Sequence, residues 1–215
     1  MFPRASKLCL NEIIIPRLAP VAPTHAFTHP MEITMIRSLL IGALVLAGVA
    51  PAAAHVTLET QEANIGMPYK AVLRVPHGCE GSATIALRVR IPDGVIAVKP
   101  MPKPGWMLTT SIGKYSKTYS FFHNAKLSEG VTEISWSGGK LPDAWYDEFV
   151  FQGFLAGDLE AGKTLYFPVV QECEQGVHRW IEIPAAGKSA ADYPEPAPAL
   201  RLLPAPALQP GMQPR

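Results

Sequence analysis

The chain has 215 residues, a formal net charge of +1, 48% hydrophobic residues and 17% charged residues. This length and hydrophobic content predict one globular domain with terminal extensions, and they exclude a mostly disordered chain. A net charge so close to zero argues against a dedicated nucleic-acid-binding protein, which usually carries a basic surplus.

The first part of the chain, residues 1–34, is rich in proline and has no hydrophobic periodicity. We interpret it as an over-extension of the reading frame or as a disordered leader, with Met1, Met31 and Met35 as alternative starts. No functional residue is expected in this segment.

Residues 35–54 have the order of features typical of a secretory signal peptide. The basic residue Arg37 precedes an apolar run, and Ala52-Ala53-Ala54 supplies the small residues that signal peptidase requires. A retained membrane anchor or a buried helix is the alternative interpretation. We predict cleavage between Ala54 and His55, a periplasmic or secreted product, and no stable membrane anchor after cleavage.

Residues 55–185 are predicted to form an all-β domain. Short runs rich in β-branched and aromatic residues alternate with period two and end at Pro, Gly or Asp turns, and no helix of ten or more residues is apparent. About ten such strands are typical of a β-sandwich. The predicted strands are 56–60, 69–75, 83–91, 95–98, 107–111, 118–122, 131–136, 148–154, 164–170 and 177–183.

Three local features refine this prediction. Pro168 interrupts a predicted strand, so that strand should be an edge strand or contain a bulge. The predicted strand 131–136 should end in a turn at Ser137-Gly138-Gly139. Residues 186–215 are rich in Pro and Ala and are predicted to be a loosely ordered tail, although Leu200–Leu203 offers one further strand.

Removal of the leader leaves Cys79 and Cys173 as the only cysteines of the chain. An even pair of cysteines in an exported domain predicts a disulfide, and two free buried thiols are the alternative. Cleavage after Ala54 would also make His55 the first residue. Its α-amine and imidazole Nδ1 could then chelate one metal ion, and two such nitrogens suit Cu(II). The alternative is that His55 stands first by coincidence.

A series of short motifs resembles the YcnI-like family of exported copper-binding proteins, whose domain was long catalogued as one of unknown function. The resemblance extends over nearly the whole of residues 55–184. The motifs are His55-Val-Thr-Leu, Val75-Pro-His-Gly-Cys-Glu80, Pro104-Gly-Trp106, Ile134-Ser-Trp-Ser-Gly-Gly139, Tyr146-Asp-Glu-Phe-Val-Phe151, Phe167-Pro-Val-Val-Gln-Glu-Cys173 and Gly176-Val-His-Arg-Trp180.

The resemblance implies an immunoglobulin-like or cupredoxin-like β-sandwich that holds one Cu(II) in a monohistidine brace. The implied ligand is His55, and Trp180 would form an apolar wall beside the metal. Some family members have Glu where this chain has His77-Gly78, so the carboxylate position is taken by His77, by Glu80 or by Glu148.

We therefore expect a non-enzymatic, monomeric or weakly associating protein that acquires, buffers or transfers Cu(II) in the cell envelope. Its expected partners are the copper ion and another periplasmic copper chaperone or transporter, with no nucleic acid involved. Two other functions compete with this one: an immunoglobulin-like binding or adhesion module without metal, and a copper-dependent oxidative enzyme that would use His77 as a second histidine ligand.

Overall fold

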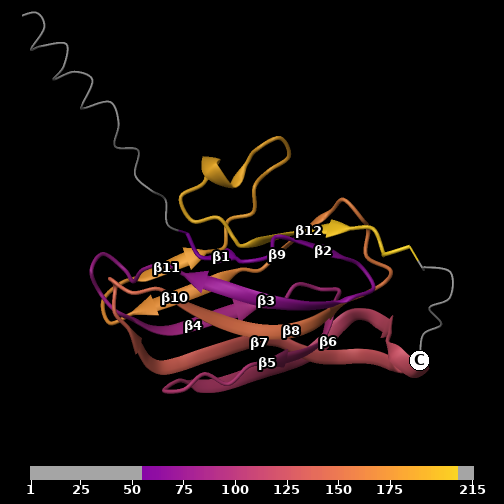
Figure 1. The fold of residues 1–215 in the computed structure, drawn as a ribbon, viewed down its shortest axis with the longest axis horizontal. Helices are drawn as coiled ribbons and strands as arrows, with labels where there is room; N and C mark the ends of the chain where they lie inside the picture. Colours follow the sequence, from indigo (N-terminus) through magenta and orange to yellow (C-terminus); the bar gives the residue numbers. More distant parts are fainter. Residues whose placement is uncertain (1–54, 208–215) are drawn as a thin grey trace, which may run out of the picture. The chain divides into compact units, whose positions relative to one another are not determined.

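The computed structural model describes residues 55–207, so the predictions for residues 1–34 and 35–54 lie outside the described residues. The described residues belong to one compact unit that contains three sheets (Figure 1). Within residues 55–207 there is no α-helix, only the two 3-10 turns η1 (Phe122–Asn124) and η2 (Ala190–Asp192). The predicted all-β sandwich with one disulfide is confirmed.

Two of the sheets are antiparallel and form the sandwich, and the third is small and mixed. The first has the order β1 (Thr57–Leu58), β3 (Pro68–Val75), β8 (Asp147–Leu155), β5 (Val95–Pro100). The second has the order β11 (Val177–Trp180), β10 (Val169–Cys173), β4 (Thr84–Arg90), β7 (Lys126–Leu141), β6 (Met107–Ser120). The third has the order β2 (Glu62–Asn64), β12 (Ala199–Leu203), β9 (Thr164–Tyr166), with β12 parallel to β2.

The core forms because alternate residues of the paired strands point inward. In β3, Tyr69, Ala71 and Leu73 are buried while Lys70 and Arg74 are exposed, as a strand with one solvated face requires. Two tryptophans, Trp106 and Trp136, meet the Phe149 ring at 4.9 and 5.5 Å between centroids. The Trp136 indole N–H is satisfied by the carbonyl of Met101 at 3.1 Å.

The long hairpin of β6 and β7 differs from the two short strands predicted at 107–111 and 118–122. The intervening residues 112–117 are mostly exposed, so their side chains give little hydrophobic alternation, yet the backbone ladder continues with register shifts. The predicted turn at Ser137-Gly138-Gly139 lies inside β7 instead. Gly138 has φ +77°, and a Cβ on Gly139 would lie 2.1 Å from the Trp106 ring, so these glycines form a bulge that accommodates Trp106.

Pro168 marks a change of sheet rather than an edge or bulge within one strand. The chain leaves β9 at Tyr166 and enters β10 at Val169, so the predicted strand 164–170 is divided between two sheets. The proline lacks a donor, but its carbonyl accepts a hydrogen bond from the Arg90 N–H at 2.9 Å.

The domain extends beyond the boundary predicted at residue 185. Strand β12 pairs with both β2 and β9, and its Leu200 and Leu202 side chains are buried in the main core. The optional strand predicted at 200–203 is therefore present, and residues 186–207 are not a loose tail. The Pro/Ala composition obscured this because only two leucines of the segment enter the core.

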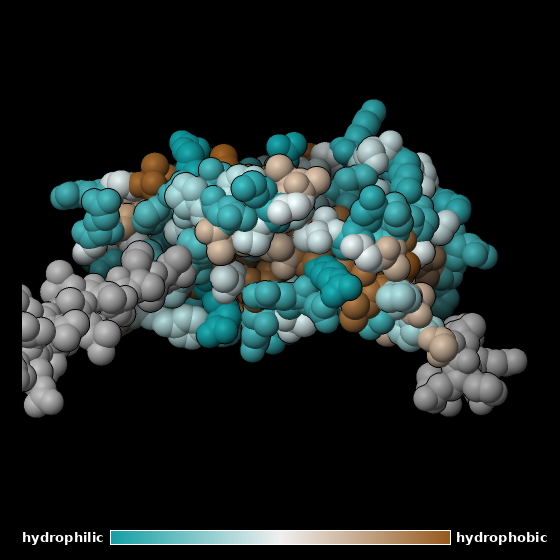
Figure 2. Space-filling view, turned by 90° about the horizontal axis from the view of Figure 1, so that it is seen from above, coloured by the Kyte–Doolittle hydropathy of each residue, from teal (hydrophilic) through white to brown (hydrophobic). Residues whose placement is uncertain are grey.

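The surface carries polar and apolar side chains in small groups. The face in Figure 2 is mostly hydrophilic, with apolar side chains scattered between the polar ones. Of the exposed large apolar residues, Trp145 is the most exposed at 65%. Across residues 55–207, no helix has the length and apolar character that a membrane span requires.

The disulfide joins Cys79, in the connection from β3 to β4, with Cys173 at the end of β10, with the Cα atoms 6.0 Å apart. The two cysteines are separated by 94 positions, so the bond restricts a long loop in the unfolded chain. We predict that replacing both cysteines by serine lowers the free energy of unfolding by about 3–5 kcal/mol. Urea unfolding of the processed protein measures this, and the wild type under reductant should match the variant. Equal stability of oxidised and reduced protein would contradict the prediction.

A second prediction concerns Asp93 in the turn between β4 and β5. Burial opposes ionisation of Asp93, but hydrogen bonds from the Ser116 and Tyr119 hydroxyls outweigh it, so the pKa of Asp93 is lowered. A carboxyl group with a lowered pKa stabilises the fold above its unfolded pKa and loses this effect as the pH falls through the folded value. We expect Asp93→Asn to cost about 1 kcal/mol at pH 7, a modest value because the site is solvated.

This cost should begin to shrink below about pH 4, the pKa of an unfolded aspartate, and should disappear once the pH has fallen through the lower folded pKa of Asp93, where the wild-type carboxylate is protonated too. Urea unfolding at a series of pH values measures the difference. The matched control is Asp158→Asn, which removes an exposed ion pair with Lys117 and should change stability by less than about 0.5 kcal/mol. A cost for Asp93→Asn that stays constant down to pH 2 would refute the assignment.

Candidate functional site

The candidate site lies where the outer strands of the two large sheets meet. Strand β1 is the edge of the four-stranded sheet and β11 is the edge of the five-stranded sheet. His55 lies two residues before β1, and its ring centroid lies 5.4 Å from that of Trp180 in β11. The next residue, Val56, is buried in the core and fixes the position of His55. Two residues predicted from the sequence to share a site are thus in contact.

Strand β11 adds a histidine to this contact. His178 and Trp180 are two residues apart and therefore share one face of the strand, with ring centroids 4.9 Å apart. Gln171 of β10 lies directly opposite His178 in the antiparallel ladder. Trp180 is 3% exposed, whereas the His178 side chain is 25% exposed. The histidine is therefore reachable from solvent while the tryptophan forms the wall behind it.

His77 reaches the same place from the connection between β3 and β4. Its ring centroid is 6.0 Å from that of His178. The connection is tightly built: the Gly78 N–H donates to Asp143 at 3.0 Å, and a Cβ on Gly78 would lie 1.9 Å from the Ser82 carbonyl oxygen. Glycine is required there because the backbone approaches itself so closely. His77 is thus held next to the disulfide residue Cys79.

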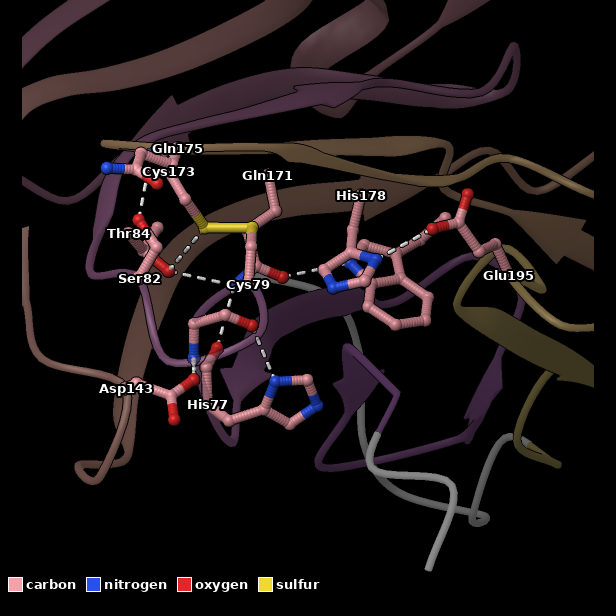
Figure 3. Close-up of a disulfide and its surroundings, with 12 residues drawn as sticks. His77, Cys79, Ser82, Thr84, Asp143, Gln171, Cys173, Gln175, His178 and Glu195 are labelled. Atoms are coloured by element: carbon pink, nitrogen blue, oxygen red, sulfur yellow. Dashed lines mark hydrogen bonds and ion pairs between the residues drawn. A yellow bond between two sulfur atoms is a disulfide. The ribbon is translucent and has the colours of Figure 1, made fainter. Parts of the chain in front are cut away.

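Gln171 links these residues through a buried hydrogen-bond network. Its side chain is fully buried and accepts a hydrogen bond from the Trp180 indole N–H at 3.0 Å. Its amide group donates to the carbonyl of His77 at 2.7 Å and to the Thr84 hydroxyl at 2.8 Å. Figure 3 shows Gln171, His77 and Thr84 around the Cys79–Cys173 disulfide. One side chain therefore fixes both Trp180 and the backbone that carries His77.

Glu195 is a site residue that the sequence analysis did not identify. One carboxylate oxygen accepts from Nδ1 of His178 at 2.7 Å, and the other accepts from the Arg179 N–H at 3.1 Å (Figure 3). Glu195 lies in the segment predicted to be a loose tail. A single acidic residue between prolines gave no pattern that would have indicated its role. The isolated bridge between Glu182 and Pro196 holds this segment beside the chain that leaves β11.

Glu148 occupies a different environment from the histidines. It is the second residue of β8 and lies opposite Arg74 of β3 in the antiparallel ladder. Its carboxylate accepts a hydrogen bond from the Tyr146 hydroxyl. The neighbouring Asp147 forms an ion pair with Lys103 at 2.7 Å. Ring contacts thus connect three predicted site residues, His55, His77 and Trp180, by way of His178. The fourth, Glu148, interacts with Tyr146 and Arg74 instead.

The nitrogen and oxygen donors near His55 limit how a metal ion could bind there. In residues 55–207 no three His, Cys, Asp or Glu side chains are already gathered into a metal-binding group. A chelate that uses the N-terminal amine needs only one histidine side chain, because the amine supplies the second nitrogen. A small pocket of about 110 Å³ lies beside His55, lined also by Gln61 and by residues 196–199. The site therefore fits a metal through the amine and the imidazole of His55, not through a preformed three-ligand group.

Comparisons with known proteins agree with the fold and leave the activity open. The chain belongs to the family described as the domain of unknown function DUF1775, which matches residues 55–202. It is also similar to a crystal structure of an uncharacterized protein from Nocardia farcinica that reveals an immunoglobulin-like fold. The identity is 26% and the TM-score 0.50, over 70% of this chain and 99% of the other. No curated protein matches the chain.

Replacing Gln171 by leucine tests the buried network. The variant leaves the Trp180 indole N–H and the His77 carbonyl without their partner, and an unsatisfied buried polar group costs about 1–3 kcal/mol. We predict a loss of about 2–4 kcal/mol in the free energy of unfolding, measured with urea. The matched control is Gln152→Leu on the exposed face of β8, which should change stability by less than about 0.5 kcal/mol. If both variants are equally stable, the network does not hold the site together.

Proposed function

We propose that the processed protein is an exported Cu(II)-binding protein of the YcnI-like kind, and that its site is built on His55 as the first residue. The observation that carries this proposal is the contact between His55 and the buried Trp180 at the edge of the sandwich. Membership of the DUF1775 family supports the proposal, because the match begins at residue 55, where the signal peptide is predicted to end.

The chemistry of the proposed site follows from a free amine. In the precursor the His55 nitrogen is a peptide amide, whose lone pair is delocalised into the carbonyl group, so it is a much poorer metal ligand than an amine at neutral pH. After cleavage it becomes an α-amine with an ordinary pKa near 8, and Cu(II) displaces its proton readily. The amine and Nδ1 then hold one ion in a chelate ring. Trp180 would shield one side of this ion as an apolar wall, since indole offers only an N–H donor.

His77 is the better proposed source of a further ligand than Glu148. The Nδ1–H of His77 donates to the Gly78 carbonyl at 2.6 Å, so a neutral ring carries its lone pair on Nε2. His77 belongs to the same group of rings as Trp180 through His178. Glu148 interacts with Tyr146 instead.

A copper site with few protein ligands exchanges its ion readily. We therefore propose acquisition, buffering or transfer of Cu(II) in the periplasm or outside the cell, with another copper chaperone or a transporter as the partner. The partly exposed side chain of His178 and the position of His55 at the edge of the sandwich support such an exchange, because a partner can approach this edge.

The proposal predicts that copper affinity depends on processing. The chain 55–215 with a free amine on His55 should bind one Cu(II) about 100-fold more tightly than the same chain with an acetylated N-terminus, because acetylation turns the chelating amine into an amide. Isothermal titration measures the affinity, and electron paramagnetic resonance measures nitrogen coordination.

The matched control is His123→Ala, which removes a histidine from the exposed turn η1 and should leave the affinity unchanged. The His55→Ala variant should lose affinity by at least as much as the acetylated chain. Equal affinity of the acetylated and the unacetylated chains would show that the amine is not a ligand. Absence of 1:1 binding by the processed chain would refute the copper function.

A further inference from the structure

We propose that this protein has a second binding site, a cavity at the end of β4 that takes a small organic acid with one carboxylate and an apolar body. The cavity has a volume of about 530 Å³ and is lined by the turn after β4 and by residues of β6, β7 and β9. This volume lies within the range of about 300–1,000 Å³ that is usual for small-molecule pockets. No lining residue belongs to the site at His55, so the inference is independent of the Cu(II) proposal.

Backbone hydrogen bonds hold two walls of this cavity in place. The Ile91 N–H donates to the Thr132 carbonyl at 2.9 Å, which fixes the end of β4 against β7. The Arg90 N–H donates to the Pro168 carbonyl at 2.9 Å, which fixes the same end against the crossing from β9 to β10. The cavity is therefore preformed, and a ligand can enter it without a costly rearrangement of the chain.

Asp93 is the one carboxylate of the lining, and hydrogen bonds already engage it. Its side chain accepts from the hydroxyls of Ser116, which also lines the cavity, and of Tyr119. These bonds tie the turn after β4 to strand β6 and close the third wall. In the described part of the chain Asp93 forms no ion pair with the two cations of the lining, Arg90 and Lys114. The lining thus has a surplus of one positive charge.

Arg90 and Lys114 are exposed, and within residues 55–207 their side chains make no hydrogen bond or ion pair. Carboxylates are present nearby: Glu133 lies opposite Arg90 in the ladder of β4 and β7, and Glu129 lies opposite Lys114 in the ladder of β6 and β7. Neither of these opposed pairs forms an ion pair. The two cations are therefore available to a carboxylate that enters the cavity, and a guanidinium can bind it through two parallel hydrogen bonds.

The apolar part of the lining determines what kind of anion fits. Ile91 and Val95 are buried, at 7% and 0% exposed, and Tyr115, Val131 and Tyr166 are partly buried. An inorganic anion would leave this surface in contact with water. A ring or a short alkyl chain would cover it, which is favourable in proportion to the apolar area removed from water. The ligand class is therefore an aromatic or short aliphatic monocarboxylate.

A solvent-filled hollow with ordinary surface charges is the competing explanation. Three probes separate the two. Naphthoate and naphthalenemethanol have the same rings but differ in charge, and inorganic phosphate has the charge without the apolar body. A solvent-filled hollow would not distinguish naphthoate from the other two.

In the processed protein we expect naphthoate to bind one-to-one with a Kd of about 0.1 mM, about tenfold more tightly than naphthalenemethanol or phosphate. Isothermal titration measures the affinities, and shifts of the backbone amide resonances locate the site. Arg90→Gln and Lys114→Gln should each weaken naphthoate binding about fivefold, because each removes one cation, and should leave naphthalenemethanol binding unchanged. The matched controls are Arg201→Gln and Lys70→Gln, which remove exposed cations of β12 and β3 and should match the wild type.

Equal affinity for naphthoate and naphthalenemethanol would overturn the proposal, because the cavity would then not recognise a carboxylate. Phosphate binding as tight as that of naphthoate would overturn it too, because the apolar wall would then contribute nothing. The same holds if both charge variants bind naphthoate like the wild type, or if the shifted amides lie away from the cavity. The probe comparison and the amide shifts use the wild type alone, so they decide the question even where a variant fails to fold.

Discussion

The buried amide of Gln171 is the interaction on which the edge of this sandwich depends. It lies in β10, one strand in from the edge, and uses both its donor and its acceptor capacity inside the core. A buried amide is stable only when its hydrogen bonds are made, so its three partners are fixed together. Because these partners belong to β4, to β11 and to the connection after β3, the positions of His77 and Trp180 are coupled through one side chain.

The site occupies an edge because a sandwich leaves its outer strands incompletely covered. Both β1 and β11 have only one hydrogen-bonded neighbour, and each is short. Edge strands that remain exposed invite pairing with other chains. Here the segment with Glu195 covers part of β11, and the ring of His55 packs on Trp180, so polar and aromatic groups protect this edge. The side chains that cover this edge include the imidazoles of His55 and His178, so nitrogen donors lie where solvent can reach them.

Much of the fold follows from local sequence signals, whereas the site depends on long-range packing. The alternation in 69–75 and 148–154 predicted β3 and β8 because their buried faces are continuous. The alternation failed at 112–117, where backbone pairing rather than side-chain burial maintains the strand. His55 was predicted as a site residue from its position after the signal-peptidase site, and Trp180 through the family resemblance. Glu195 was missed because no local pattern connects a Pro/Ala-rich segment with an edge strand. The environment of Glu148 could not be predicted either, because it depends on the packing of Tyr146 and Arg74.

The order of the site residues along the chain has a kinetic consequence. His55 begins the described domain, His77 follows β3, and His178 and Glu195 come only after ten of the twelve strands. Contacts between residues so distant in sequence carry a large loop-closure cost, which slows folding. A chain still emerging from the ribosome or threading through a membrane lacks this group of rings until the residues of β11 have followed. The rings can come together only when the segment before β1 and strand β11 are both present in the folded chain.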